Sequence, residues 1–398
     1  MVEDEPNTMV AGAGMGVVNS IENAWLVIEQ GKIGCYGTGE VIPFSDDEIL
    51  DCRGGMVMPA FCDSHTHLVY AGSREMEYEA KIRGLNYEEI ARRGGGILNS
   101  AAILSNTTEE QLYEQSYPRV REIMRSGTGA VEIKSGYGLT TKDELKMLRV
   151  IKKLDEETPL VIKSTFLGAH AFPAEYKSDP DGYVKLVIGE MIPAVAEENL
   201  ADFIDVFCDR GFFSVEQTTR ILEAGIAHGL VPKIHANELD YSGGIQVGVS
   251  CNARSVDHLE YVGEEELNAL AGKDTMPSLL PGASFFLGLP YAPARKIIEA
   301  GLPVALASDY NPGSSPSGNM ELIMSLGITQ LKMLPYEVLN AVTQNGAFAM
   351  GIEETHGSIT VGKVASLIIT NPIPSFSFMP YSYGTSQIQK VIINGKIQ

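Results

Sequence analysis

The pattern of apolar and polar residues divides the chain into a long central region between two β-rich ends. Near the start, short apolar runs at 24–29 and 33–36 flank Gln30-Gly31-Lys32, which is typical of two antiparallel strands joined by a turn. Near the end, the segments 357–370 and 386–396 have the pattern of hairpin strands, and Asn394-Gly395 is a strong turn signal. The ends, 1–55 and 352–398, are therefore predicted to combine into one small β-domain.

The central region, 56–351, alternates short strand-like segments with longer segments of helical periodicity. The predicted strands include 130–133, 160–166, 203–207, 231–235 and 304–308. In the predicted helix 141–155, apolar residues recur at helical spacing between a threonine cap and Pro159: Leu145, Leu148, Ile151 and Leu154. This alternation indicates parallel strands with crossover helices, and a (β/α)₈ barrel typically needs about 250 residues. A doubly wound sheet is the alternative architecture.

Composition and charge narrow the classes of function. Hydrophobic residues make up 44% and charged residues 20%, as in folded globular proteins rather than disordered ones. Thirty Lys and Arg against 51 Asp and Glu give a net charge of −21, which repels nucleic-acid backbones and anionic membrane surfaces. An anionic substrate would therefore need a local cation at its binding site.

The cysteines and the start of the chain bear on the compartment. Five widely spaced cysteines without a C-x-x-C pair argue against a disulfide framework and against a thiolate zinc site. The first residues lack a secretory signal pattern, and no run of about 18 apolar residues is found. We therefore expect a cytoplasmic protein with neither a membrane nor a nucleic-acid partner. A homodimer is compatible with the sequence but is not indicated by it.

A pair of histidines follows the apolar segment 56–62. His65 and His67 are separated by one residue, so in a strand both side chains point to the same side. Two imidazoles at the C-terminal end of a strand can bind one metal ion, but a His-x-His pattern alone is common in proteins. Further ligands from other parts of the chain must decide whether this is a metal site.

Other candidate ligands also stand at the ends of predicted strands. His235 ends the segment 231–235, Glu238 follows three residues later, and Asp309 comes directly after 304–308. In a (β/α)₈ barrel all strand C-termini open onto one face, so these side chains can converge despite their separation in sequence. Three histidines and a carboxylate, with a position left for water, are typical of a catalytic metal site.

Six motifs continue the pattern around these residues: 65–75 (HTHLVYAGSRE), 94–98 (GGGIL), 134–139 (KSGYGL), 168–171 (GAHA), 235–238 (HANE) and 309–316 (DYNPGSSP). Together they resemble the amidohydrolase superfamily, and within it the enzymes of histidine degradation that act on 4-imidazolone-5-propanoate. The resemblance implies a metal-bearing (β/α)₈ barrel of residues 56–351 beside a β-sandwich built from both chain ends. It also implies hydrolysis of the cyclic C–N amide bond to N-formimino-L-glutamate, with metal-activated water as the nucleophile.

The same resemblance assigns roles to individual residues. The implied metal ligands are His65, His67, His235 and Asp309. The implied substrate contacts are Arg74, Tyr137, His170, Glu238, Asn311, Gly313 and Ser314. Glu238, His258 and Asp309 are expected to carry the proton transfers, with His258 and Asp309 as alternative bases and Glu238 beside a ring nitrogen. Arg74 is chemically apt, because a guanidinium can bind the propanoate carboxylate through two hydrogen bonds in this acidic protein.

We expect a single divalent ion, Zn²⁺ or Fe²⁺, with Mn²⁺ less suited; imidazoles and a carboxylate do not separate these metals sharply. Many members of the superfamily bridge two ions with a carboxylated lysine at a strand end. Lys163 lies seven residues before His170, up to about 23 Å away along an extended strand, at or near the wrong end of the barrel. Lys134 is nearer the mouth and is the residue that could overturn this prediction.

Two other functions remain open at this point. A deaminase that removes exocyclic ammonia from a ring would also use a His-x-x-Glu pattern beside a metal, and ammonia release would distinguish it. A catalytically silent barrel that binds a ligand would hold the metal without turnover. Gly94-Gly95-Gly96 is expected in a loop at the barrel mouth rather than in a phosphate-binding loop, and His228 and His356 are expected to be structural.

Overall fold

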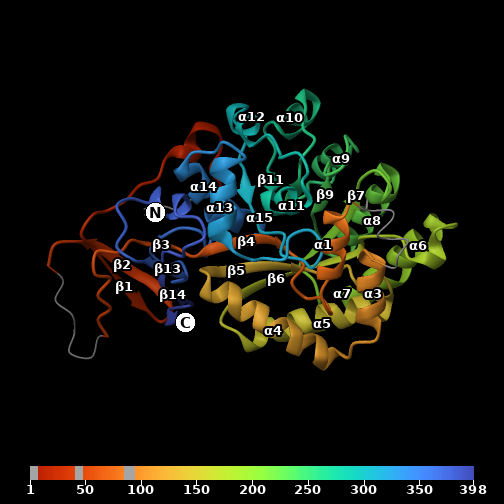
Figure 1. The fold of residues 1–398 in the computed structure, drawn as a ribbon, viewed down its shortest axis with the longest axis horizontal. Coiled ribbons are helices and arrows are strands. Elements are labelled where there is room, and N and C mark those ends of the chain that lie inside the picture. The colour runs from red at the N-terminus through yellow and green to blue at the C-terminus, as the bar shows by residue number, and fades with distance from the viewer. Residues whose placement is uncertain (1–7, 41–47, 85–94) are drawn as a thin grey trace.

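The computed structural model describes residues 8–40, 48–84 and 95–398, and its centre is a ring of parallel strands surrounded by helices (Figure 1). Around the ring the strands are β4 (Phe61–Thr66), β5 (Thr128–Lys134), β6 (Val161–Ala169), β7 (Phe203–Cys208), β9 (Ile234–Ala236), β10 (Ser255–His258), β11 (Met276–Leu279) and β12 (Ala305–Leu306), with the short β8 (Val231–Pro232) beside β7. Each pairs with its neighbour in parallel.

The first and last strands close the ring. Thr66 at the end of β4 forms a parallel bridge with Tyr310, just after β12. The N–H of Asp309 donates to the carbonyl of His65 at 3.0 Å, and the N–H of His67 donates to the carbonyl of Tyr310 at 2.9 Å. A doubly wound sheet would leave both edge strands open, so the predicted (β/α)₈ barrel is confirmed.

The helices follow the strands along the chain and cover the outside of the barrel. The described helices are α1 (Glu75–Ile82), α3 (Ile97–Ser105), α4 (Glu109–Arg125), α5 (Thr141–Glu157), α6 (Pro180–Leu186), α7 (Ile192–Glu197), α8 (Val215–Ala227), α9 (Gly244–Ser250), α10 (Glu264–Leu270), α11 (Pro281–Leu287), α12 (Ala294–Glu299), α13 (Met320–Thr329), α14 (Pro335–Val342), α15 (Gln344–Ala349) and α16 (Phe378–Tyr381). Within the described ranges, none of them has the length and apolar character needed to cross a membrane.

Helix α5 shows why the periodic pattern was informative. The hydroxyl of Thr140 accepts the N–H of Asp143 at 3.2 Å, which caps the helix start. The four apolar residues of the predicted stripe are all buried against the barrel, and the helix ends two residues before Pro159. The predicted helix is confirmed and is two residues longer than expected.

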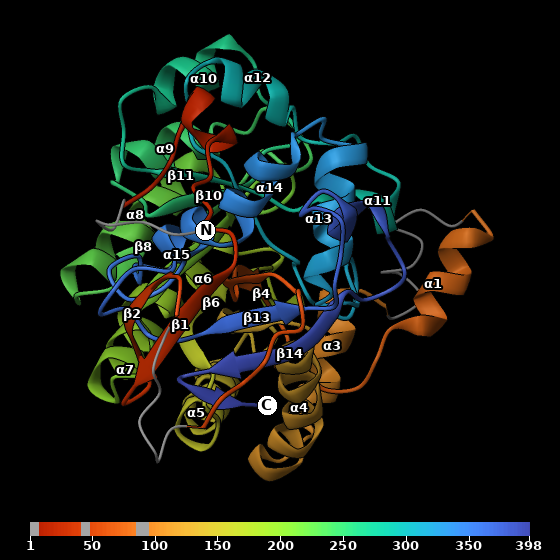
Figure 2. The ribbon, with the colours of Figure 1, turned by 90° about the vertical axis from the view of Figure 1, so that its left-hand side faces the viewer.

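The chain ends form small antiparallel sheets beside the barrel (Figure 2). One has the strand order β15 (Lys396–Ile397), β14 (Ile388–Ile393), β13 (Leu367–Thr370) and β3 (Val57–Pro59), and β1 (Ala24–Glu29) pairs with β2 (Lys32–Thr38) in the other. Asn394 and Gly395 turn between β14 and β15 with positive φ angles of 51° and 75°. Ile33 of β2 donates its N–H to the carbonyl of Lys363, which joins the two ends of the chain.

The limits of the two domains stay a prediction. Ala60 alone separates β3, in the small sheet, from β4, in the barrel. The strand that carries the first two candidate ligands is therefore continuous in the chain with the small sheet.

Candidate active site

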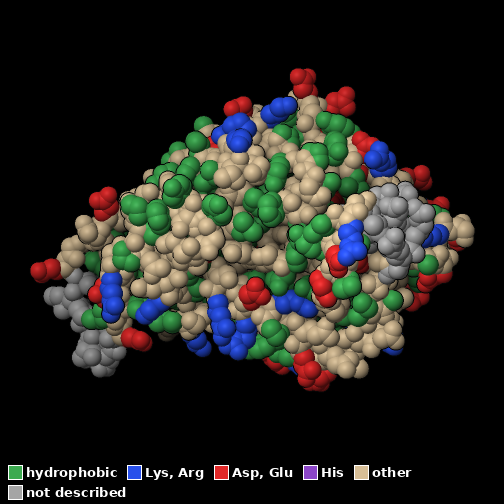
Figure 3. Space-filling view, in the orientation of Figure 1, with side chains coloured by type: hydrophobic (Ala, Val, Ile, Leu, Met, Phe, Trp, Pro, Cys, Tyr) green, Lys and Arg blue, Asp and Glu red, His purple; other side chains and the backbone are tan. Residues whose placement is uncertain are grey.

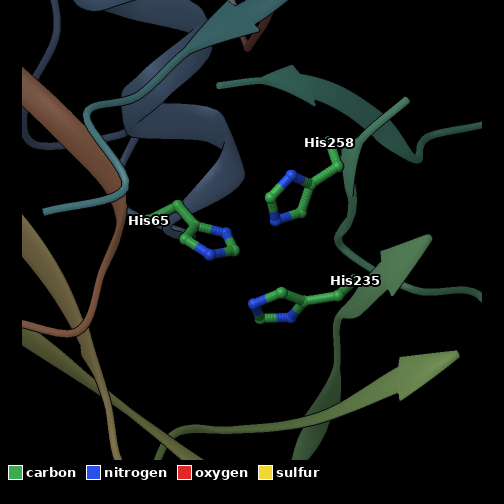
Figure 4. A group of neighbouring side chains, drawn as sticks. All are labelled: His65, His235 and His258. Carbon is green, nitrogen blue, oxygen red and sulfur yellow. The ribbon is translucent and has the colours of Figure 1, made fainter. Parts of the chain in front are cut away.

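The four predicted metal ligands converge at the C-terminal ends of β4, β9 and β12. The Nε2 atoms of His65 and His67 are 3.3 Å apart, and those of His67 and His235 are 3.4 Å apart. Asp309 Oδ1 lies 3.7 Å from His65 Nε2 and 3.6 Å from His67 Nε2. All four residues are buried. Figure 4 shows His65 facing His235 and His258 across the barrel mouth.

Two buried carboxylates orient the imidazoles. His65 Nδ1 lies 2.6 Å from Asp257 Oδ2, and His235 Nδ1 lies 2.9 Å from Asp205 Oδ2. A carboxylate accepts, so in His65 the proton sits on Nδ1 and Nε2 is left with its lone pair facing the other ligands. Such lone pairs repel unless a cation lies between them. Ligand nitrogens about 2.0–2.1 Å from a tetrahedral ion stand roughly 3.3–3.4 Å apart, which matches the His65–His67 and His67–His235 spacings. Two overlapping sets of buried groups are close enough to hold an ion: His65 with His67 and Asp309, and His65 with His235 and His258.

Residues with a left-handed backbone lie at the end of β10 and just after β12. Asp309 has φ of 52°, His258 has φ of 86° and Leu259 has φ of 63°, all in the left-handed region that side chains other than glycine rarely adopt. Such conformations persist where the surrounding structure fixes them, and they are frequent at active sites. Here Asp309 lies near the Nε2 atoms of His65 and His67, and His258 lies near Glu238.

A lysine ties the two orienting carboxylates together. Lys134 Nζ lies 2.5 Å from Glu132 Oε1, 2.8 Å from Asp205 Oδ2 and 3.5 Å from Asp257 Oδ2. Burial lowers the pKa of Lys134, but these carboxylates raise it further, and the net pKa is above its usual range. A persistent ammonium is a poor candidate for carboxylation, which needs the free amine. Lys163 instead pairs with Asp202 at 2.6 Å, with both side chains partly exposed.

Glu238 and His258 form a second pair beside the ligands. His258 Nε2 lies 3.6 Å from Glu238 Oε2, and His258 Nδ1 lies 3.7 Å from Glu260 Oε2. Burial and the neighbouring carboxylates of Glu260 and Asp309 raise the pKa of Glu238 to about 7. Burial lowers the pKa of His258, but Glu238 and Glu260 outweigh this effect and raise it to about 10. A proton can therefore be held between these groups near neutral pH.

The loop after Asp309 is closed on itself. Asn311 Oδ1 accepts the N–H groups of Gly313 and Ser314, each at 2.8 Å, and Asn311 Nδ2 donates to Ser314 Oγ at 2.6 Å. Ser314 Oγ donates to Asp309 Oδ2 at 3.2 Å. Arg74 packs directly on this loop, since a Cβ on Gly313 would lie 2.2 Å from Arg74 Nη1. The loop thus connects a metal ligand with the predicted carboxylate-binding arginine.

Tyr137 and His170 form an aromatic wall next to the ligands. Their ring centroids are 5.4 Å apart, and the His170 ring is stacked on that of His67 at 5.3 Å. His170 Nδ1 lies 3.0 Å from the carbonyl oxygen of Gly136, which can only accept, so Nδ1 carries the proton. Burial and His235 lower the pKa of His170 to about 3, so its Nε2 is a hydrogen-bond acceptor at neutral pH.

The structure brings the predicted site residues together, but sequence reasoning missed several groups around them. These are Asp205, Asp257, Glu132, Glu260, Asp209 and Glu144. Asp205 within 203–208 (FIDVFC) and Glu132 within 128–134 (TGAVEIK) carried a usable signal, because a carboxylate inside an apolar strand must be paired when buried. His228 contacts the carbonyl of Ala224 at the end of α8, and Gly94 lies outside the described residues.

On the face of the molecule in Figure 3, acidic and basic side chains are scattered, and the purple of histidine is not seen among the described residues. This view agrees with the burial of the imidazole cluster inside the barrel mouth.

The amidohydrolase family model matches residues 56–398, from the residue before β3 to the end of the chain. The chain belongs to the amidohydrolase family. This amidohydrolase is 56% identical over 397 residues to the imidazolonepropionase of Christiangramia forsetii, covering 100% of the chain and 97% of that protein. It is 56% identical over 389 residues to the imidazolonepropionase of Flavobacterium johnsoniae, covering 98% and 95%. The 5-methylcytosine deaminase of Klebsiella pneumoniae shares its fold, with a TM-score of 0.73 at 17% identity and coverage of 94% and 93%.

Proposed function

We propose that this amidohydrolase opens 4-imidazolone-5-propanoate to N-formimino-L-glutamate by hydrolysis of the cyclic C–N amide bond. The observation that carries the proposal is the 56% identity, over the whole chain, with a protein named imidazolonepropionase. The site adds a chemical argument, because Arg74 supplies a cation next to the 311–314 loop in a protein of net charge −21.

His65, His67, His235 and Asp309 would hold one divalent ion, and the orientation of their donor atoms supports this assignment. Zn²⁺ and Fe²⁺ both suit this donor set, and Mn²⁺ suits it less. When bound, such an ion supplies Lewis-acid activation of water. Asp257 and Asp205 contribute by fixing the rings of His65 and His235.

The other side chains bind the substrate and move protons. Arg74 anchors the propanoate carboxylate, and Asn311, Gly313 and Ser314 shape the pocket beside it. Tyr137 and His170 contact the ring, with His170 Nε2 accepting a hydrogen bond from a ring N–H. Asp309 can take the proton released from water directly, whereas His258, with its pKa raised to about 10, can do so only after passing its own proton to Glu238; Glu238 then delivers a proton to the ring nitrogen as the C–N bond breaks.

The decisive experiment is a steady-state assay of the purified, metal-analysed protein with freshly generated imidazolonepropanoate. We expect N-formimino-L-glutamate to form without ammonia. Ammonia release from a ring substrate would instead support the deaminase alternative, and metal binding without any turnover would support a silent ligand-binding barrel.

We also propose a cytoplasmic location, since all five cysteines are free thiols and structural disulfides are rare in reducing compartments. A homodimer stays a prediction that size-exclusion chromatography with light scattering will test.

A further inference from the structure

A buried carboxylate of α5 binds the backbone of the loop that carries Tyr137. Glu144, in the first turn of α5, is fully buried. Its Oε2 accepts the N–H of Gly136 at 3.0 Å, and its Oε1 accepts the N–H groups of Gly138 at 2.7 Å and Leu139 at 2.9 Å. Three backbone donors of a single short loop therefore converge on one side chain.

The loop has a conformation that is difficult to hold without this carboxylate. Gly136 has φ of 109° and Leu139 has φ of 54°, so the chain is left-handed on both sides of Tyr137. At Gly138 a Cβ would lie 2.4 Å from the backbone nitrogen of Glu144, which shows how closely loop and helix approach. Without an acceptor here, three buried N–H groups would lose their partner, which buried backbone donors rarely tolerate.

The same loop sets the position of His170. The carbonyl of Gly136 accepts the proton of His170 Nδ1 at 3.0 Å, and a Cβ on Gly136 would lie 2.9 Å from that nitrogen. The His170 ring in turn lies 5.4 Å from the ring of Tyr137 and 5.3 Å from that of His67. Glu144 is thus linked to both aromatic side chains of the wall through the backbone at residue 136.

We propose that Glu144 is a positioning residue for substrate binding, which fixes Tyr137 through the 136–139 loop and His170 through the carbonyl of Gly136. The inference rests on the proposed function, in which these two side chains contact the imidazolone ring. Glu144 acts through the hydrogen bonds that it accepts from the backbone of this loop.

The test compares Glu144→Gln with Asp143→Asn in the full-length metal-loaded enzyme. Asp143 is the neighbouring buried carboxylate of the same helical turn, but it pairs with Lys146 at 2.9 Å rather than with the loop. In Glu144→Gln only one oxygen can accept, and the new NH₂ group must face at least one backbone N–H of the 136–139 loop, which is also a donor. Because this loop would lose its fixed position, we expect the KM for imidazolonepropanoate to rise roughly tenfold or more. We expect kcat to change less than about threefold, the metal content to stay the same, and Asp143→Asn to leave KM unchanged.

A second readout does not depend on turnover. In ¹⁵N-histidine spectra, the Nδ1–H signal of His170 should shift in Glu144→Gln and stay in place in Asp143→Asn. If the parent enzyme does not hydrolyse imidazolonepropanoate, the proposed function fails while this spectrum still tests the link between Glu144 and His170. An unchanged KM with an unchanged His170 signal, or equal KM changes in both variants, would overturn the inference. Should Glu144→Gln not fold, Glu144→Asp, whose shorter side chain cannot span the three donors, must show the same rise in KM.

Discussion

Glu77 holds the guanidinium of Arg74 in place. Glu77 Oε2 accepts hydrogen bonds from Arg74 Nε at 2.9 Å and from Nη2 at 2.7 Å, and its other oxygen accepts the N–H of Gly96 at 2.9 Å. The pair is almost fully buried, with 8% and 11% of the side chains exposed. Arg74 therefore loses little side-chain freedom when it binds a substrate carboxylate, which favours affinity.

Arg74→Met should weaken substrate binding strongly. Losing a charge-assisted, mostly buried contact costs about 2–5 kcal/mol, or roughly 30- to 4,000-fold in kcat/KM. Metal content should be retained, because Arg74 is not one of the four proposed ligands. Arg83→Met is the control, since the Arg83 side chain is 71% exposed and pairs with Glu79. A kcat/KM for Arg74→Met within about threefold of the parent would show that Arg74 is not the anchor.

Metal removal should abolish activity and leave the fold intact. The core of the barrel is built from apolar side chains that do not depend on an ion, unlike that of a small zinc finger. Protein treated with a chelator should keep its circular dichroism spectrum and regain activity with one equivalent of Zn²⁺ or Fe²⁺. His65→Ala should lose metal, whereas the exposed His228 can be replaced by Ala without effect. Two tightly bound equivalents per chain would contradict the single-ion assignment.

Lys134→Met should destabilise the protein far more than Lys163→Met. Lys134 lies among three buried carboxylates, of which Glu132 also pairs with Lys233, and removing Lys134 takes the ammonium group away from Asp205 and Asp257, at a cost of about 3–5 kcal/mol. The pair of Lys163 and Asp202 is partly exposed and contributes about 0–1 kcal/mol. Urea denaturation of both variants measures the difference. If both variants lose the same free energy of unfolding, the buried ion pairs of Lys134 do not contribute more to stability than the exposed pair of Lys163.

His258→Gln should show whether His258 or Asp309 is the base, and Glu238→Gln should test the proton donor to the ring nitrogen. If His258 takes part in the proton transfer, its replacement lowers kcat by roughly 10²–10⁴-fold, with metal retained. A near-parental kcat would leave Asp309 as the base. Glu238→Gln should lower kcat by a similar factor, and normal turnover in both variants would rule out the proposed proton transfers.

The buried side chain of His356, which lies away from the site, should lower the free energy of unfolding at acid pH. Burial, followed by the charge of Lys363, lowers the pKa of His356 from 6.5 to about 4. The unfolded chain therefore takes up this proton at a higher pH than the folded one, so stability is lost as the pH falls from about 6.5 to 4. His356→Gln should reduce this loss by up to about 3 kcal/mol, with no change in pH dependence above pH 7. Denaturant titrations at pH 7 and pH 4.5 would measure it, with His228→Gln as the control.

The residues at strand ends could be predicted because strands in a (β/α)₈ barrel all open at one face. The buried carboxylates that contact these residues could not be predicted, because such contacts depend on which strands lie near one another in the barrel and in which register. Asp257 meets His65 only because the ring brings β10 opposite β4, and no spacing in the sequence encodes that contact. Glu144 was hidden for a different reason: within the helical pattern of α5 it is indistinguishable from a solvent-facing glutamate.

Two predicted strand boundaries differ from those in the structure. The predicted strand 231–235 is divided into β8 and β9, and Pro232, which has no N–H to donate, lies at the division. The apolar segment 56–62 gave no sign that it would be shared between β3 and β4, in two different sheets. The second feature arises from pairing with β13, a strand that lies far along the chain.

During synthesis on the ribosome, β3 is made long before β13, the strand with which it pairs. Met58 lies opposite Ile368 in this sheet, about 310 residues later in the chain. At a synthesis rate of about 5–20 residues per second, β3 waits roughly 15–60 s for its partner. During this interval the segment leading into His65 has an open strand edge, so the nascent chain is most exposed to mispairing just upstream of its first metal ligand.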